Sequence, residues 1–113
     1  MSTKSRVLQD RRQMSRVASH LKCQVSYNET SYDAIILNLS LNGAYISSSF
    51  LPSVGETVTI TLRTLDLKNS LIIEGLVVRG NSGVSDHGVL KRFGIQFNHS
   101  YLQLISIISK LSS

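Results

Sequence analysis

Residues 35–48 read IILNLSLNGAYISS, and this stretch decides the fold. Its apolar residues share one face: Ile35, Leu37, Leu39 and Leu41. Its polar residues share the other: Asn38, Ser40 and Asn42. A period of two predicts a half-buried β-strand with a row of hydrogen-bonding side chains on its outer side. The pair Asn42-Gly43 then predicts a tight turn, with a glycine that can adopt a positive φ.

The same short-strand pattern extends along the chain in both directions. Strands are expected over residues 21–27, 32–40, 44–49, 57–63, 71–79 and 93–97. Gly75 suggests a bend or bulge in the fifth strand, and residues 80–88, with three glycines, are expected to form a mobile loop. Six short strands without helical crossovers predict an all-β fold, either an antiparallel barrel or a sandwich.

From Ser100 onward the period becomes helical, which predicts a C-terminal helix over one end or one open side of the sheet. Five apolar residues fall on one stripe: Tyr101, Leu104, Ile105, Ile108 and Leu111. Leu102 and Ile107 widen this stripe. So wide a face either packs deeply or meets a second subunit, so a homodimer through this helix is one expectation.

Positive charge gathers at the N-terminus. The first 22 residues hold six basic residues and one acid, whereas residues 23–113 hold six of each, so the first 22 account for the net charge of +5. Residues 1–18 lack periodicity and are interpreted as a flexible basic arm, followed by one folded domain over residues 19–113. A basic arm on a neutral body favours an anionic partner, although a solvated tail has the same composition.

Several kinds of chemistry find no support in the sequence. The single cysteine, Cys23, and the separated His20, His87 and His99 lack the spacing of a metal site. The acidic residues form no pair suited to acid–base catalysis, so the chain is expected to be a binding module rather than an enzyme. Neither a signal peptide nor a membrane span is expected, and the lone cysteine fits a reducing cytoplasm.

Two short motifs remain. RQMSR places Arg12 and Arg16 four residues apart, and NLSLNG follows with Asn38, Ser40 and Gly43. Together, in this order and within a small all-β domain, they resemble the PilZ family, as do LPSVGE and RFGIQF further along. The resemblance covers residues 10–112 and implies a six-stranded antiparallel β-barrel. It also implies a bacterial receptor for the second messenger cyclic di-GMP, with no other cofactor.

The resemblance assigns ligand-binding roles to particular residues. Arg12 and Arg16 would clamp the ligand, because a guanidinium can fork onto phosphate oxygens or a guanine edge. Asn38 and Ser40 would offer short donors and acceptors, and Gly43 would allow close backbone approach. An extra basic residue at Arg11 implies two stacked cyclic di-GMP molecules per domain.

Two further residues, Tyr45 and Arg79, could border this site, although each also fits a barrel-surface position. We expect the ligand to draw the arm across the Asn38 face and so change the surface seen by a downstream protein effector. The output, whether motility, exopolysaccharide or pili, is left open.

Two alternatives stay open. A PilZ-like adaptor could bind protein without binding nucleotide. A basic arm on a small barrel also suits a single-stranded nucleic-acid binder, but the chain has only three phenylalanines, four tyrosines and no tryptophan for base stacking.

Overall fold

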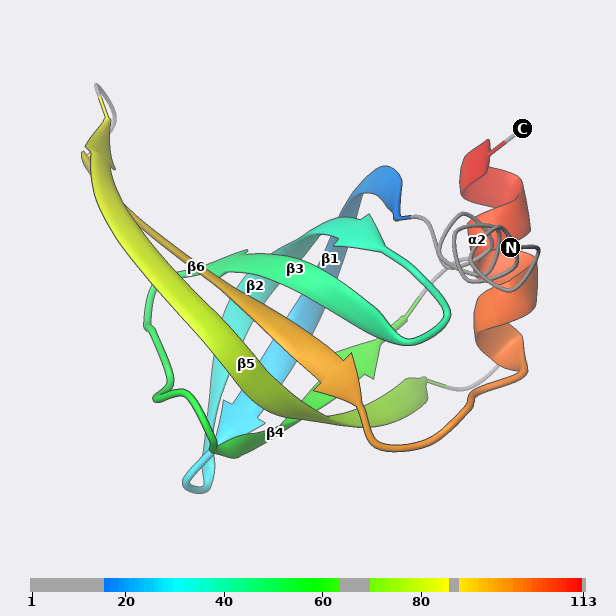
Figure 1. The fold of residues 1–113 in the computed structure, drawn as a ribbon, viewed down its shortest axis with the longest axis horizontal. Coiled ribbons are helices and arrows are strands. Elements are labelled where there is room, and N and C mark those ends of the chain that lie inside the picture. The colour runs from blue at the N-terminus through cyan, green and yellow to red at the C-terminus, as the bar shows by residue number, and fades with distance from the viewer. Residues whose placement is uncertain (1–15, 64–69, 86–87, 113) are drawn as a thin grey trace, which may run out of the picture.

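Six strands and one helix make up the regular structure of the described residues, which are 16–63, 70–85 and 88–112 of the computed structural model (Figure 1). The elements are β1 (Val17–Tyr27), β2 (Thr30–Leu39), β3 (Gly43–Ser48), β4 (Thr57–Leu62), β5 (Leu71–Ser85), β6 (Gly88–Phe97) and α2 (Gln103–Ser112). β1 begins at Val17, inside the segment expected to be an arm. The rest of that expected arm, residues 1–15, lies outside the described residues.

The strands close into a barrel in the order β1-β2-β3-β6-β5-β4, with β4 returning to β1. All neighbouring pairs are antiparallel. Within β4, Val58, Ile60 and Leu62 are buried while the threonines between them are not, as a period of two requires. Of the two architectures expected, the six-stranded antiparallel barrel is confirmed.

Apolar side chains from every strand and from the helix fill the interior. Those with almost no exposed surface are Val25, Ile36, Leu39, Ile46, Val58, Ile60, Leu62, Ile73, Val77, Phe93, Ile95 and Leu104. The barrel is therefore filled by its own core, and any ligand face must lie on its outside.

One extra residue in β2 shifts the phase of that strand. Ile36 faces the core, but the next pair in the β2–β3 ladder joins Asn38 to Tyr45, so Leu37 is bulged. Ile36 and Leu39 are consequently both buried although they lie three residues apart. The bulge turns Asn38 outward, where an unbroken alternation would have sent it into the core.

The apolar face expected for this strand is therefore wrong in part. Leu39 is buried, but Ile35 and Leu37 are only half-buried, and Leu41 is 37% exposed beyond the end of the strand. Strict alternation assigns every second residue to the same face, so it fails after a bulge, where one extra residue reverses the assignment. The apolar composition of the strand does not reveal the extra residue.

β5 contains a second bulge with the same effect. Val77 is buried, Val78 is the extra residue, and Arg79 pairs with Gly94. Arg79 would otherwise follow Val77 into the core, and the bulge turns it outward. The irregularity was expected at Gly75, which instead lies close to β6: a Cβ there would meet a β6 side-chain atom at 3.0 Å.

Beyond the barrel, β5 and β6 continue as a two-stranded ribbon, formed by residues 83–85 and 88–90 (Figure 1). β5 pairs with β4 only as far as Leu76, and β6 pairs with β3 only from Lys91. The loop expected over residues 80–88 is therefore wrong for residues 80–85, which continue β5, and for Gly88, which begins β6. Residues 86–87 lie outside the described residues. Glycine and serine suggested a loop, yet a ribbon outside the core needs little side-chain burial.

α2 lies at one end of the barrel and packs beside β1 (Figure 1). Only part of its apolar surface is buried. Leu104 and Ile107 are buried, while Leu102 is 78% and Ile105 is 55% exposed. The expected stripe was right for Leu104 and wrong for Ile105, because Ile107 faces the barrel instead. A homodimer through this helix stays a prediction.

Candidate functional site

Four residues that are neighbours in register cross the outside of the barrel, and we call them the outer row: Asn38 on β2, Tyr45 on β3, Gly94 on β6 and Arg79 on β5. Each is the ladder partner of the next. Cross-strand partners lie about 4.5–5.5 Å apart, so their side chains interact directly. The two bulges create this row, because each precedes one of its polar members.

The Arg79 side chain lies across Gly94 and reaches Tyr45. Its guanidinium carbon is 5.2 Å from the centroid of the Tyr45 ring, which is a cation–π distance. A Cβ on Gly94 would come within 3.0 Å of Arg79 Nε. The missing side chain at Gly94 is therefore what lets the guanidinium lie flat over the sheet.

Arg16, the residue immediately before β1, contacts the same row. Its Nη1 donates a hydrogen bond to Asn38 Oδ1 at 3.0 Å. Partial burial, and then the positive charge of Arg79, lower the pKa of Arg16. Arg16 at Asn38 and Arg79 over Tyr45 therefore place two positive charges on neighbouring positions of the outer row, where like charges repel.

No carboxylate offsets this concentration of charge within the described part of the chain. Neither Arg16 nor Arg79 forms an ion pair there. Asn38 and Tyr45 between them are uncharged. An anion placed over the outer row would relieve the repulsion and accept hydrogen bonds from both arginines.

The connection from β2 to β3 is held by Ser40, which is 1% exposed. The Ser40 hydroxyl accepts a bond from the Asn42 backbone N–H at 3.3 Å and lies 2.7 Å from Asn42 Oδ1 and 3.3 Å from the Gly43 carbonyl. The Ser40 N–H donates to that same carbonyl. The Ser40 hydroxyl therefore fixes the loop beside Asn38, and its expected contact with a ligand stays a prediction.

Gly43 is required by a neighbouring strand. Its φ is not positive, although the Asn42-Gly43 turn suggested that it could be. A Cβ at this position would lie 2.5 Å from the Ile95 carbonyl oxygen on β6. Gly43 therefore allows the close approach of the β6 backbone, whereas the expected close approach to a ligand stays a prediction.

The structure brings four of the six predicted site residues together: Arg16, Asn38, Ser40 and Gly43. The other two, Arg11 and Arg12, lie outside the described residues. Arg79 and Tyr45, which the sequence could not place, are members of the outer row. Gly94 was missed, although a glycine at an outward position of the strand RFGIQF is a signal of close approach.

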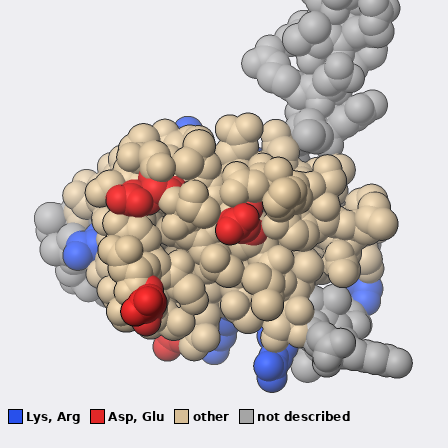
Figure 2. Space-filling view, turned by 90° about the horizontal axis from the view of Figure 1, so that it is seen from below, with Lys and Arg blue, Asp and Glu red and all other residues tan. Residues whose placement is uncertain are grey.

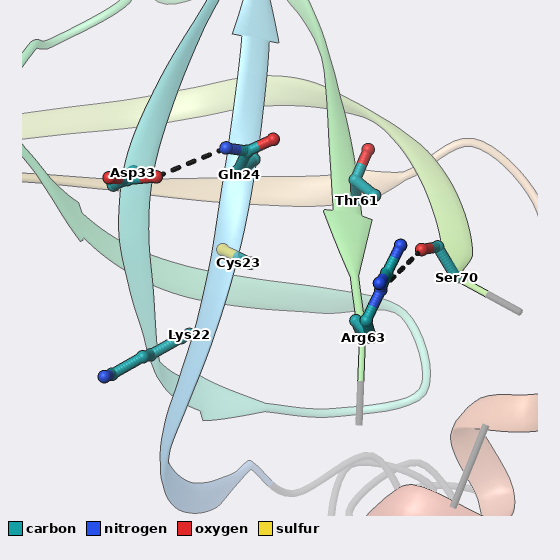
Figure 3. A pocket seen from close by; sticks show the side chains of 7 residues that line it. All are labelled: Lys22, Cys23, Gln24, Asp33, Thr61, Arg63 and Ser70. Atoms are coloured by element: carbon teal, nitrogen blue, oxygen red, sulfur yellow. Dashed lines mark hydrogen bonds between the residues drawn. The ribbon is translucent and has the colours of Figure 1, made fainter. Parts of the chain in front are cut away.

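A separate groove of about 400 Å³ lies on the β1–β4 side of the barrel (Figure 3). Its lining residues are Lys22, Cys23, Gln24, Asp33, Thr61, Arg63 and Ser70. Gln24 bonds to Asp33 and Arg63 bonds to Ser70, each at 3.3 Å. Burial raises the pKa of the Cys23 thiol to about 12, so Cys23 is not an activated nucleophile.

Charge is unevenly distributed over the surface. Figure 2, turned so that the molecule is seen from below, shows a largely uncharged face with acidic side chains across it and basic ones near its margins. Among the described residues no group of three or more His, Cys, Asp or Glu side chains is placed to hold a metal ion. In the same residues, no helix has the length and apolar character needed to cross a membrane.

Fold and outer row together define the class: a small antiparallel β-barrel domain with a filled core and an arginine-bearing external face. The family follows from the sequence match. The chain belongs to the PilZ domain family, whose model matches residues 10–110. No curated protein matches this chain significantly.

Solved structures share the fold at low sequence identity. The PilZ domain of Escherichia coli YcgR with c-di-GMP matches with a TM-score of 0.68 and 14% identity, covering 87% of this chain and 88% of that one. Bacillus subtilis MotI/DgrA, an inhibitor of motility, has a TM-score of 0.64 and 14% identity, and the match covers 86% of this chain. MrkH of K. pneumonia in its apo state has a TM-score of 0.66 and 16% identity, and the match covers 88% of this chain.

The chain corresponds to only part of two of these proteins. It spans 47% of the MotI structure and 49% of the MrkH structure. Its likeness to them is therefore that of one domain.

Proposed function

We propose that this PilZ domain binds the bacterial second messenger cyclic di-GMP on the outer row, with the arginine motif of residues 12–16 closing over it. One observation carries the proposal. Arg16 and Asn38 belong to the two separate sequence motifs, 22 residues apart, and they are joined by a 3.0 Å hydrogen bond on the outer face. Family membership and the c-di-GMP named with the YcgR structure support the same ligand.

The chemistry of the outer row suits this ligand. Cyclic di-GMP presents two phosphates and two guanines, so it needs cationic donors and flat stacking surfaces. The arginines at positions 16 and 79 have planar guanidinium groups without carboxylate partners in the described residues, so both can donate to phosphate or to guanine O6 and N7. The Tyr45 ring offers a surface on which a base can stack.

The remaining motif residues have supporting roles in this proposal. Ser40 fixes the loop that follows Asn38, and Gly43 keeps β3 tight against β6. Arg12 supplies a second clamp from the arm. Arg11 beside it would serve a second, stacked cyclic di-GMP molecule, so a stoichiometry of two ligands per chain is the expectation to test.

Binding would also order the arm, and this is the proposed signal. Arg16 leads directly into β1 and already contacts Asn38, so a ligand held there would draw residues 5–18 across the outer row. Fixing each residue costs about 1–2 kcal/mol, so several ligand contacts must form together. Hydrogen exchange of residues 5–18 should slow in saturating cyclic di-GMP. Unchanged exchange in ligand-bound protein would rule out arm ordering.

Isothermal titration calorimetry with cyclic di-GMP tests the binding itself. Arg16→Ala and Asn38→Ala should each weaken binding at least about 10-fold, because hydrogen bonds to charged groups are worth about 1.5–3 kcal/mol. Arg63→Ala is the matched control, since it also removes one arginine from the outer surface but from the opposite groove. Equal loss in all three variants, or no binding by the native chain, would contradict the proposal.

PilZ domains are binding and adaptor domains, so a protein partner is part of the proposal. The exposed Leu102 and Ile105 on α2 form an apolar surface that suits a downstream effector or a second copy of the chain. An adaptor that binds no nucleotide is the main alternative, and it predicts a silent calorimetric titration. A single-stranded nucleic-acid binder would instead bind unrelated oligonucleotides with steep salt dependence.

A further inference from the structure

Arg92 lies on the same outer face as the outer row, one step toward the ribbon. It precedes Gly94 by two residues on β6, so both point outward. Its ladder partners are Ser47 on β3 and Asn81 on β5. Asn81 is itself two residues beyond Arg79. Arg92 and Arg79 are therefore diagonal neighbours on adjacent strands, with Cα atoms about 7–8 Å apart.

The guanidinium of Arg92 is incompletely satisfied. Its Nε is buried and has no hydrogen-bond acceptor among the described residues. It also forms no ion pair within that part of the chain. A buried donor without a partner destabilises the folded state, so fold stability alone poorly explains an arginine at this position.

We propose that Arg92, with Asn81 and Ser47 beside it, forms a second anion subsite at the base of the ribbon and takes a phosphate of the bound cyclic dinucleotide. This inference rests on the proposed function and extends its site beyond the two sequence motifs. It adds a contact from β6, a strand that carries neither motif.

The geometry separates this subsite from the first. Arg79 turns over Gly94 toward Tyr45, whereas Arg92 sits two residues away along β6, a distance of about 7 Å. Arg92 is therefore placed to bind a different anionic group from the one held by Arg16 and Arg79. Ser47 and Asn81 add a hydroxyl and an amide, which can donate to phosphate oxygens. None of these neighbours is acidic.

Calorimetric titration of the full chain with cyclic di-GMP at two or more salt concentrations tests the subsite. Arg92→Ala should raise Kd roughly 10-fold and make the salt dependence of Kd shallower, while Arg63→Ala leaves both unchanged. Arg92→Lys should recover part of the affinity, because a lysine keeps the charge but loses the planar fork. Thermal melts should show no loss of stability in either alanine variant, and Arg92→Ala should be at least as stable as the native chain because it removes the unpartnered Nε donor.

The outcomes separate the two claims. If the native chain binds, Arg16→Ala abolishes binding and Arg92→Ala equals Arg63→Ala, the subsite is wrong and the proposed function stands. If the native chain does not bind, both are wrong. If Arg92→Ala lowers the affinity at unchanged stoichiometry, Arg92 binds the same ligand molecule as Arg16. If Arg92→Ala halves the stoichiometry, Arg92 binds a second ligand molecule. Either result supports the subsite.

Discussion

Gly43 and Gly94 shape the outer face of the barrel through the side chains that they lack. At Gly43 an added Cβ would meet the Ile95 carbonyl oxygen at 2.5 Å, and at Gly94 it would meet Arg79 Nε at 3.0 Å. The first neighbour is backbone inside a ladder, which cannot move without breaking the β3–β6 pairing. The second is the end of a flexible side chain. The same substitution should therefore damage stability at one position and binding at the other.

Gly43→Ala should destabilise the barrel by about 2 kcal/mol or more, because overpacking a fixed site costs about 1–3 kcal/mol. Urea denaturation measures the change. Gly83→Ala is the control, since a Cβ there meets nothing within 4 Å, and its effect should stay within about 0.5 kcal/mol. Equal stability of the two variants would show that the contact with Ile95 is not limiting.

Gly94→Ala should instead spare the fold and weaken ligand binding. The new methyl group displaces the Arg79 guanidinium from Tyr45, so we expect an unfolding free energy within about 1 kcal/mol of the native value and roughly a 10-fold higher Kd for cyclic di-GMP. Calorimetry and urea denaturation measured on the same sample separate the two effects. Native-like affinity would mean that Arg79 binds from another position or not at all.

At the level of strands and helix, alternation predicted most elements and failed at the bulges. The buried face of β4 was predicted correctly, because threonines separate its three core residues. That of β2 was not, because Ile35, Ile36 and Leu37 are all apolar and give no sign of which one is extra. The bulge before Arg79 could not be predicted for the same reason: Val77 and Val78 are identical in type, and only Val78 is the extra residue. The two register shifts that build the outer row arise where β2 pairs with β3 and β5 pairs with β6. The residue pattern of one strand carries no information about its pairing with another.

The orientation of α2 can be tested with two residues one position apart. Leu104→Ala should cost about 2–5 kcal/mol of stability, because Leu104 is fully buried against the barrel. Ile105→Ala should change stability by less than about 0.5 kcal/mol, since that side chain is 55% exposed. Thermal or urea denaturation of the two variants measures both changes in stability. Similar losses for both would mean that Ile105 is covered, for example by a second subunit, which sedimentation would reveal.

The ribbon should be dispensable for the fold. Replacing residues 83–90 with Asn-Gly would join Ser82 to Lys91, which are ladder partners, through a two-residue hairpin turn. The core residues and Arg79, Asn81 and Arg92 all remain, so stability should change by no more than about 1 kcal/mol. Affinity for cyclic di-GMP should be unchanged. A non-cooperative melt would show that the ribbon supports the barrel.

Over the whole molecule, the sequence motifs predicted Arg16 and Asn38 for the candidate site, and the fold added Arg79 and Gly94 beside them. The motifs around Arg16 and Asn38 were visible in the sequence, and the barrel joins them by a hydrogen bond. Arg79 and Gly94 come from strands with no motif of their own, and only the closed order of strands brings them beside Tyr45. Positive charge therefore gathers on this face from two distant parts of the chain, Arg16 before β1 and Arg79 on β5.

A two-dimensional NMR titration of the full chain with cyclic di-GMP tests the proposed binding face most directly. The largest amide shifts should fall on the outer row, at Asn38, Tyr45, Gly94 and Arg79, and should saturate together. The groove around Lys22 and Arg63 should stay unshifted and serves as the internal control. Shifts confined to that groove, or no shifts at saturating nucleotide, would contradict the assignment of this face as the cyclic di-GMP site.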